Sequence, residues 1–230
     1  MIVSHSNHYF FIKTAKTAGT SIEISLTHHV GPADIVTEQD PNYPDLLSSI
    51  VPLSGLNNEK PFSCFNVLDW KTFLKNRVRP KFWTHCPASE VRRLIGQDSF
   101  ENYFSFAVVR NPFDRAISLY WYKFKKTAET MRPTISEFIA EGPPERFSDW
   151  SRISINNRIA VKKILKYESL QLDLDAISKD IGFNISIKDI NAKSGIREGN
   201  AHYSELLNRR DVDRLELYCR REIDEFNYSF

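Results

Sequence analysis

The 230-residue chain lacks several features that mark particular classes of protein. Its three cysteines, Cys64, Cys86 and Cys219, are far apart and include no CxxC pair, so we expect neither a disulfide framework nor a bound metal. It has no run of about 18 apolar residues, and its first residues lack the basic and apolar segments of a signal peptide. We therefore expect a soluble, cytoplasmic protein without a transmembrane segment.

The chain also has little net charge. It contains 31 lysines and arginines and 29 acidic residues, and the resulting formal charge of +2 is too small to indicate nucleic acid as a partner. Hydrophobic residues make up 41% of the chain, a value typical of globular proteins, and the length suits one core. We expect a single domain over residues 1–230, in which any anion is bound by a local cluster.

Apolar runs alternate with segments of helical spacing. The expected strands are residues 9–12, 81–85, 104–110 and 162–167, and each precedes a predicted helix. Pro87 is expected to begin one helix and Gly96 to end it, while Asn111 and Pro112 are expected to begin another. Residues 212–226 have the spacing of an amphipathic helix. This alternation predicts an α/β fold, with a central parallel sheet flanked by helices on both faces.

Residues 30–61 interrupt this alternation. Five prolines break any periodicity in the segment: Pro32, Pro41, Pro44, Pro52 and Pro61. A long segment without regular structure in a compact domain is usually functional or mobile. We expect an irregular insertion that faces the acceptor of a reaction.

The segment KTAGTS, residues 16–21, directly follows the first predicted strand region and opens a helix. In a parallel sheet such a turn presents unpaired N–H groups to a ligand at the carboxyl ends of the strands. Gly19 permits close approach of the backbone, Lys16 adds a charge, and the hydroxyl groups of Thr17, Thr20 and Ser21 can donate. The loop therefore suits a phosphate, although simple helix capping explains these six residues equally well.

The segment AVVRNPFDRAISLY, residues 107–120, offers a second site for an anion. Arg110 ends a predicted buried strand, where its fork of donors can clamp an anion, and Ser118 lies two turns into the next helix on the side facing that strand end. The alternative is a plain helix start in which Arg115 pairs with Asp114 at the surface.

Together the two segments resemble the sulfotransferase superfamily, and more closely its Golgi-type and bacterial carbohydrate sulfotransferase branch, the family 2-like sulfotransferases. The stretches 85–96, 166–170 and 221–230 resemble the same family. The resemblance implies a P-loop-containing nucleotide-binding fold. It also implies transfer of a sulfuryl group from 3′-phosphoadenosine 5′-phosphosulfate to a hydroxyl group, most often of a carbohydrate, without a metal.

The resemblance also assigns residues to the two ends of that nucleotide. The 5′-phosphosulfate would be bound by Lys16, Thr17, Ala18, Gly19, Thr20 and Ser21. Arg110 and Ser118 would clamp the 3′-phosphate. In the segment 191–203, Arg197 and Lys193 are weaker candidates to close over this phosphate, because such a segment is more often a solvated loop.

Two positions depart from the family pattern. Ala15 stands where a proline commonly precedes the loop lysine, which should reduce rigidity without changing the chemistry. Asn227 replaces the more usual glycine in the Phe-Gly-Tyr ending of the family, and this change concerns packing.

Sulfuryl transfer requires a cation near the leaving oxygen and a base for the acceptor hydroxyl, by analogy with phosphoryl transfer. Lys16 suits the first role. His85 is the predicted base, because it ends a predicted strand and corresponds to a catalytic histidine in some of the family; otherwise it caps the helix that starts at Pro87. Glu23 is the runner-up base, and its alternative role is to stabilise the helix dipole.

Two other functions remain open from the sequence. A kinase or nucleoside triphosphatase would place its lysine after the glycine and an aspartate after an apolar strand, for which FNVLD, residues 65–69, is a faint candidate. A strand that ends in Arg110 argues against that function. A non-catalytic module that binds a nucleotide or glycan is the other alternative, and the basic run 75–81 would suit an anionic glycan or a solvated face.

Overall fold

The computed structural model describes residues 1–47, 49–187, 190 and 201–230. Its centre is a five-stranded sheet with the order β3-β1-β2-β4-β7. The strands are β1 (Ile2–Ser4), β2 (Tyr9–Ile12), β3 (Ile35–Val36), β4 (Phe104–Val109) and β7 (Lys163–Lys166). The strands β2, β4 and β7 run parallel, as predicted, but β1 is antiparallel to both β2 and β3. The prediction of a fully parallel sheet is therefore wrong at this edge, and the fold is a mixed α/β arrangement.

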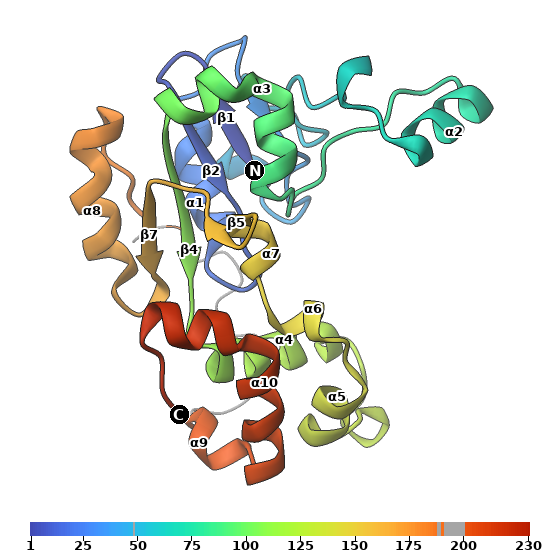
Figure 1. The fold of residues 1–230 in the computed structure, drawn as a ribbon, viewed down its shortest axis with the longest axis vertical. Helices are drawn as coiled ribbons and strands as arrows, with labels where there is room; N and C mark the ends of the chain where they lie inside the picture. The colour runs from blue at the N-terminus through green and yellow to red at the C-terminus, as the bar shows by residue number, and fades with distance from the viewer. Residues whose placement is uncertain (48, 188–189, 191–200) are drawn as a thin grey trace.

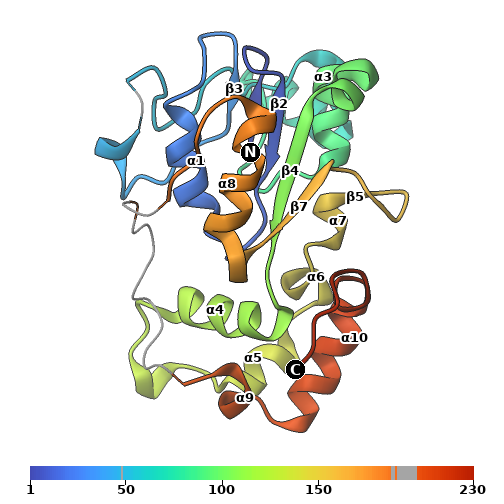
Figure 2. The same cartoon turned by 90° about the vertical axis from the view of Figure 1, so that its left-hand side faces the viewer.

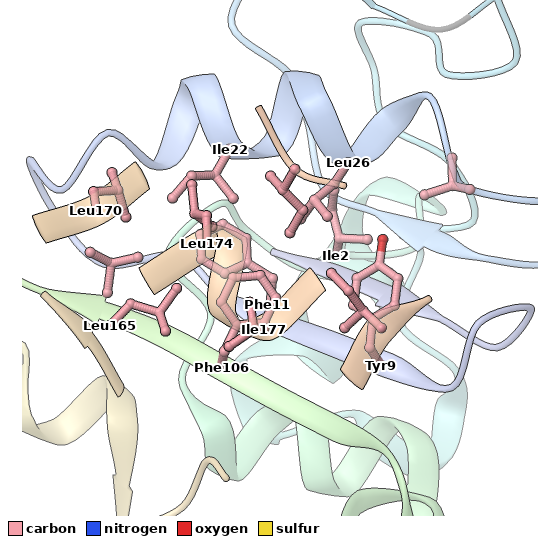
Figure 3. Close-up of a cluster of buried hydrophobic side chains, with 14 of the residues drawn as sticks. Ile2, Tyr9, Phe11, Ile22, Leu26, Phe106, Leu165, Leu170, Leu174 and Ile177 are labelled. Carbon is pink, nitrogen blue, oxygen red and sulfur yellow. The ribbon is translucent and has the colours of Figure 1, made fainter. Parts of the chain in front are cut away.

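Helices cover both faces of the sheet (Figures 1 and 2). On one face lie α1 (Gly19–Thr27) and α8 (Leu170–Ile181), and on the other lie α3 (Ala88–Asn102) and α7 (Trp150–Ile153). Alternate side chains of each strand feed the two cores, because successive residues of a strand point to opposite faces. Figure 3 shows the first core, in which the rings of Phe11 and Phe106 stack at 4.9 Å between the two helices.

A third cluster of helices packs beyond the carboxyl ends of the parallel strands (Figure 1). It consists of α4 (Pro112–Phe124), α5 (Ile135–Glu141), α6 (Pro144–Phe147), α9 (Tyr203–Leu206) and α10 (Arg209–Phe226). The predicted amphipathic face of α10 is confirmed, since Val212, Leu215 and Cys219 are buried. This cluster closes one side of the region where the predicted site residues gather.

The remaining elements are short. They are α2 (Val67–Asn76), the hairpin β5 (Ser154–Ile155) and β6 (Arg158–Ile159), and the 3-10 turns Pro44–Leu46, Phe62–Cys64, Glu129–Met131 and Tyr167–Ser169. Within the described residues of 30–61, the regular elements are β3 and the turn Pro44–Leu46. The three cysteines are buried free thiols. Among the described residues, no helix combines the length and apolar character needed to span a bilayer.

Helix boundaries agree in part with the predictions. Asn111 caps α4 by accepting from the N–H of Phe113 at 3.0 Å, and Pro112 is its first residue, as predicted. Pro87, however, lies one residue before α3. Gly96, at φ 80° and ψ 162°, ends the first part of α3, as predicted, and a second helical part continues to Asn102 and packs Phe100 on the second core.

One predicted strand is wrong, and so is the faint strand candidate at 65–69. Within residues 81–85 only an isolated bridge between Lys81 and Glu59 forms, because β1 occupies the position beside β2. The segment 65–69 begins a helix: Asn66 caps α2, and Asp69 completes the capping box and pairs with Lys60 at 2.9 Å. Asp69 is therefore not an aspartate at the end of a strand, and the feature that favoured a kinase is removed.

Candidate active site

A cleft of 1120 Å³ lies at the carboxyl ends of β2, β4 and β7. Such a position is where open α/β sheets bind ligands. Four segments form its walls: the loop that follows β2, the segment 38–42, the turn at Thr84 and the helix α4. The predicted residues that line it are Lys16, Thr17, Ala18, Gly19, Thr20, Ser21, His85, Arg110 and Ser118. The structure thus brings these residues together from three distant parts of the chain.

The loop between β2 and α1 has an unusual backbone. Lys16 and Ala18 have left-handed conformations, with φ of 61° and 58°, which non-glycine residues seldom adopt. Ala18 precedes α1, and no side chain caps the first N–H groups of this helix. A Cβ atom on Gly19 would lie 2.6 Å from Cγ of Lys13, so the loop needs a glycine there. The result is a helix start suited to an anion.

Hydroxyl groups of the loop make contacts within the protein. Oγ1 of Thr17 lies 2.8 Å from Oγ1 of Thr14, which in turn donates to the carbonyl of Val108 in β4. Ser21 donates to the carbonyl of Ile190 at 3.1 Å. These bonds hold the loop against the sheet, a role that the sequence did not reveal.

Asp149, the residue before α7, supports the loop between β2 and α1. Its Oδ2 accepts from the N–H of Ala15 at 3.1 Å and from Nη1 of Arg115 at 2.5 Å. A proline at position 15 has no N–H, so the departure from the family pattern supplies a hydrogen bond. Arg115 is 1% exposed and also contacts Glu222, so the alternative in which it pairs with Asp114 at the surface is wrong.

Arg110 joins the loop to the end of β4. Its Nη1 donates to the carbonyl of Lys16 at 2.8 Å, and its Nε and Nη2 approach Asp114 at 2.8 and 2.6 Å. The guanidinium also stacks on Tyr167 at 4.0 Å from the ring centroid. Three of its five N–H donors are used, which leaves two for a ligand. Ser118 lines the cleft one turn beyond Asp114.

His85 lies at the opposite wall, with Nδ1 3.0 Å from the carbonyl of Lys13. A carbonyl only accepts, so Nδ1 carries the proton and Nε2 of the neutral ring is an acceptor. Burial, together with the charge of Lys13, lowers the pKa of His85 below its ordinary value of 6.5. The ring is therefore neutral at pH 7, as a general base must be.

Glu23 lies apart from the cleft. It is 1% exposed, and its two carboxylate oxygens contact Nζ of Lys13 and the amino group of Met1. Burial alone would raise its pKa, but these two positive charges outweigh burial and hold the pKa of Glu23 below its ordinary value. Both oxygens are engaged, so the structure places Glu23 as the partner of Lys13.

The sequence did not predict that Tyr122 contributes to the cleft. Nζ of Lys16 lies 4.1 Å from the ring centroid of Tyr122, which follows Ser118 by one helical turn. This spacing could have predicted that Tyr122 lies on the same side of α4 as Ser118. Arg197 and Lys193 fall outside the described residues. Among the residues that the structure does describe, no group of three or more His, Cys, Asp or Glu side chains is arranged to hold a metal ion.

These features define an α/β protein whose cleft combines a helix start with two cationic side chains. The model of the Sulfotransferase family matches residues 1–229, so the chain belongs to the sulfotransferase family and is a transferase. This confirms the family predicted from the two motifs. An uncharacterized protein of Archaeoglobus fulgidus is 27% identical over 99 residues, which cover 42% of this chain and 82% of that protein.

Proposed function

We propose that the protein transfers the sulfuryl group of 3′-phosphoadenosine 5′-phosphosulfate to a hydroxyl group of a saccharide. The proposal rests on one observation: Lys16 and Arg110, joined by a 2.8 Å hydrogen bond through the backbone of Lys16, line the same cleft. A nucleotide with an anion at each end of its ribose needs two such sites. The corresponding fold is a P-loop-containing nucleotide-binding domain over residues 1–230, with 30–61 on the acceptor side.

The residues of the cleft fit this donor. The uncapped start of α1 and the close approach permitted at Gly19 suit the phosphosulfate. The residues that would hold it are Lys16, Thr17, Ala18, Gly19, Thr20 and Ser21. The two remaining donors of Arg110 and the hydroxyl of Ser118 would hold the 3′-phosphate.

The bound donor supplies an activated sulfuryl group and leaves as adenosine 3′,5′-bisphosphate. Lys16 would stabilise the charge that develops on the leaving phosphate oxygen. Nε2 of His85 would take the proton from the acceptor hydroxyl, because Nδ1 is committed to the carbonyl of Lys13. Glu23 would act on Lys13 and not as the base, because its oxygens are already bound.

The acceptor wall supports a saccharide. Residues 38–42 line the cleft opposite α4 and include Glu38, Asp40 and Asn42, whose oxygen and amide groups suit hydroxyl partners. Two of these groups are acidic, so a neutral saccharide fits this wall better than a uronate or a sulfated sugar. We therefore expect the irregular insertion to contact the acceptor through residues 38–42.

Calorimetric titration tests the donor. Adenosine 3′,5′-bisphosphate should bind without metal and more tightly than ATP with Mg²⁺, and Arg110→Ala should weaken it by about 2 kcal/mol or more. The matched control is Arg209→Ala, an arginine that is 82% exposed and also pairs with an aspartate. An unchanged affinity in Arg110→Ala would remove this residue from the site, and a preference for ATP with Mg²⁺ would favour a kinase or triphosphatase.

Transfer of radiolabelled sulfate to a panel of saccharides tests the reaction. His85→Ala should lower turnover by about 100-fold or more with little change in nucleotide affinity. Normal turnover in this variant would assign the base to another group. Nucleotide binding without transfer to any hydroxyl acceptor would instead favour a non-catalytic binding module.

A further inference from the structure

Residues 61–84 form an arm that stands out from the body of the protein, with α2 at its tip (Figure 1). Four aromatic side chains of the arm form a cluster. The rings of Phe62, Phe65 and Phe73 lie within 5.1 to 5.8 Å of one another, and Trp70 stacks on Phe62 at 5.7 Å. This cluster holds α2 without needing the outer face of the helix.

The outer face of the arm is apolar and exposed. Val67 and Leu68 are 71% and 70% exposed, Leu74 is 60% exposed and Val78 is 62% exposed. These are among the most exposed large apolar side chains of the described residues, and they lie on one short segment. A group of exposed apolar side chains of this kind marks a surface that binds a partner.

Cations lie among these apolar side chains. The five exposed basic residues of the arm are Lys71, Lys75, Arg77, Arg79 and Lys81. Lys71 lies between Val67 and Leu74 on the helix surface, since residues three and four apart are neighbours. The only acid between 61 and 84 is Asp69, which is buried against Lys60. The exposed surface of the arm is thus both apolar and strongly positive, and Arg79 also stacks on the ring of Phe62 at 4.4 Å.

This combination restricts the partner. A second copy of the chain would bring the same five cations face to face, so self-association through this surface is opposed by charge. A purely anionic ligand leaves the leucines and valines in water. An anionic lipid surface satisfies both, because the apolar side chains enter the acyl boundary while long lysine and arginine stems reach the phosphates.

We propose that the outer face of α2 and the following residues 77–81 dock the protein on an anionic lipid bilayer. The arm projects from the body of the protein (Figure 1), which suits a flat surface better than a pocket. The returning chain reaches His85 four residues after Lys81, so docking would hold the cleft close to the membrane surface. The proposal does not depend on the donor or on the reaction.

Vesicle cosedimentation of the full chain without nucleotide tests the docking. Phosphatidylcholine vesicles with a third of the lipid replaced by phosphatidylglycerol should bind the protein, whereas phosphatidylcholine alone should bind it weakly. Raising the salt to about 1 M, where the screening length is about 3 Å, should release it. Lys71→Gln with Lys75→Gln should lower the partition coefficient about 25-fold, at about fivefold per charge.

Leu68→Gln with Leu74→Gln should lower the partition coefficient about tenfold or more, because the apolar insertion is lost. The matched controls are the exposed leucines of α8 and α10, as Leu172→Gln with Leu217→Gln, and the exposed lysines Lys163→Gln with Lys179→Gln. Both controls should bind like the unchanged protein, and circular dichroism should show all four variants folded.

Three results would overturn the proposal. The first is no binding to the anionic vesicles, and the second is equal loss in the control and arm variants, which would indicate attraction by net charge alone. The third is concentration-dependent self-association in sedimentation velocity that Leu68→Gln with Leu74→Gln abolishes, which would assign the face to a second copy of the chain.

Discussion

Replacing Arg115 by methionine is expected to lower the free energy of unfolding by about 3 kcal/mol, near the low end of the range for breaking a buried ion pair. Arg115 is 1% exposed, and its Nη1 lies 2.5 Å from Asp149 and 3.2 Å from Glu222. Methionine fills a similar apolar volume but leaves both carboxylates without this cation. The loss therefore reports on charge more than on packing.

The magnitude follows from what each carboxylate retains. Asp149 keeps Arg152 and the N–H of Ala15, whereas Glu222 keeps the N–H of Asp149 at 3.0 Å and has no other cation beside it among the described residues. Glu222 thus becomes the buried charge without a counterion. The loss falls at the low end because Nη2 of Arg115 has no hydrogen-bond partner among the described residues, and a buried donor in that position costs about 1–3 kcal/mol.

Urea denaturation followed by circular dichroism measures this loss. The control is Arg209→Met, in which an exposed arginine with an aspartate partner at 2.9 Å is removed and the change should stay within about 0.5 kcal/mol. Adding Glu222→Gln to Arg115→Met should recover part of the stability, since the unpaired charge is then absent. A loss below about 1 kcal/mol, or no recovery in the double variant, would refute the reasoning.

Two further predictions concern the cleft. Burial lowers the pKa of His85, so just below pH 6.5 the unfolded chain binds more protons than the native protein. The free energy of unfolding should therefore fall as the pH drops through that value. Urea titrations at several pH values measure this dependence, and His85→Asn should remove the part that His85 contributes. Gly19→Ala should lower the free energy of unfolding by about 1–3 kcal/mol and weaken binding of adenosine 3′,5′-bisphosphate, because the added Cβ meets Cγ of Lys13, whose ammonium is fixed by Glu23. Urea denaturation measures the first effect and calorimetry the second. Unchanged values would show that the loop accommodates the added Cβ easily.

The sequence predicted those parts of the fold that depend on local patterns. The buried run of β4, the Asn-Pro start of α4 and the spacing of α10 are each encoded within a few residues. The strands β1 and β3 were missed because their pairing joins segments more than 30 residues apart and each is only two or three residues long. The sequence of 81–85 resembles a strand because a buried and an exposed side chain alternate: Phe82 is 2% exposed and Trp83 is 47% exposed. The chain there is nevertheless irregular.

The same distinction applies to the candidate site. Lys16, Arg110 and Ser118 follow from motifs and line one cleft, and His85 lines it even though the strand expected to carry it does not form. Asp149 could not be found in this way, because it contacts Ala15 across 134 residues of sequence. Contacts of this length are set by tertiary packing, which no local pattern records.

The polar contacts that support the loop between β2 and α1 link its geometry to the packing of α4 and α10. The N–H of Ala15 reaches Asp149, Asp149 contacts Arg115, and Arg115 contacts Glu222 of α10, so one buried chain of polar contacts runs from the loop through α4 to the last helix. Removing Arg115 frees Asp149 to move toward Arg152 and away from the loop. Arg115→Met should therefore weaken binding of adenosine 3′,5′-bisphosphate at urea concentrations where it remains folded, although Arg115 does not line the cleft. An unchanged affinity would show that the left-handed residues Lys16 and Ala18 hold the loop without support from Asp149.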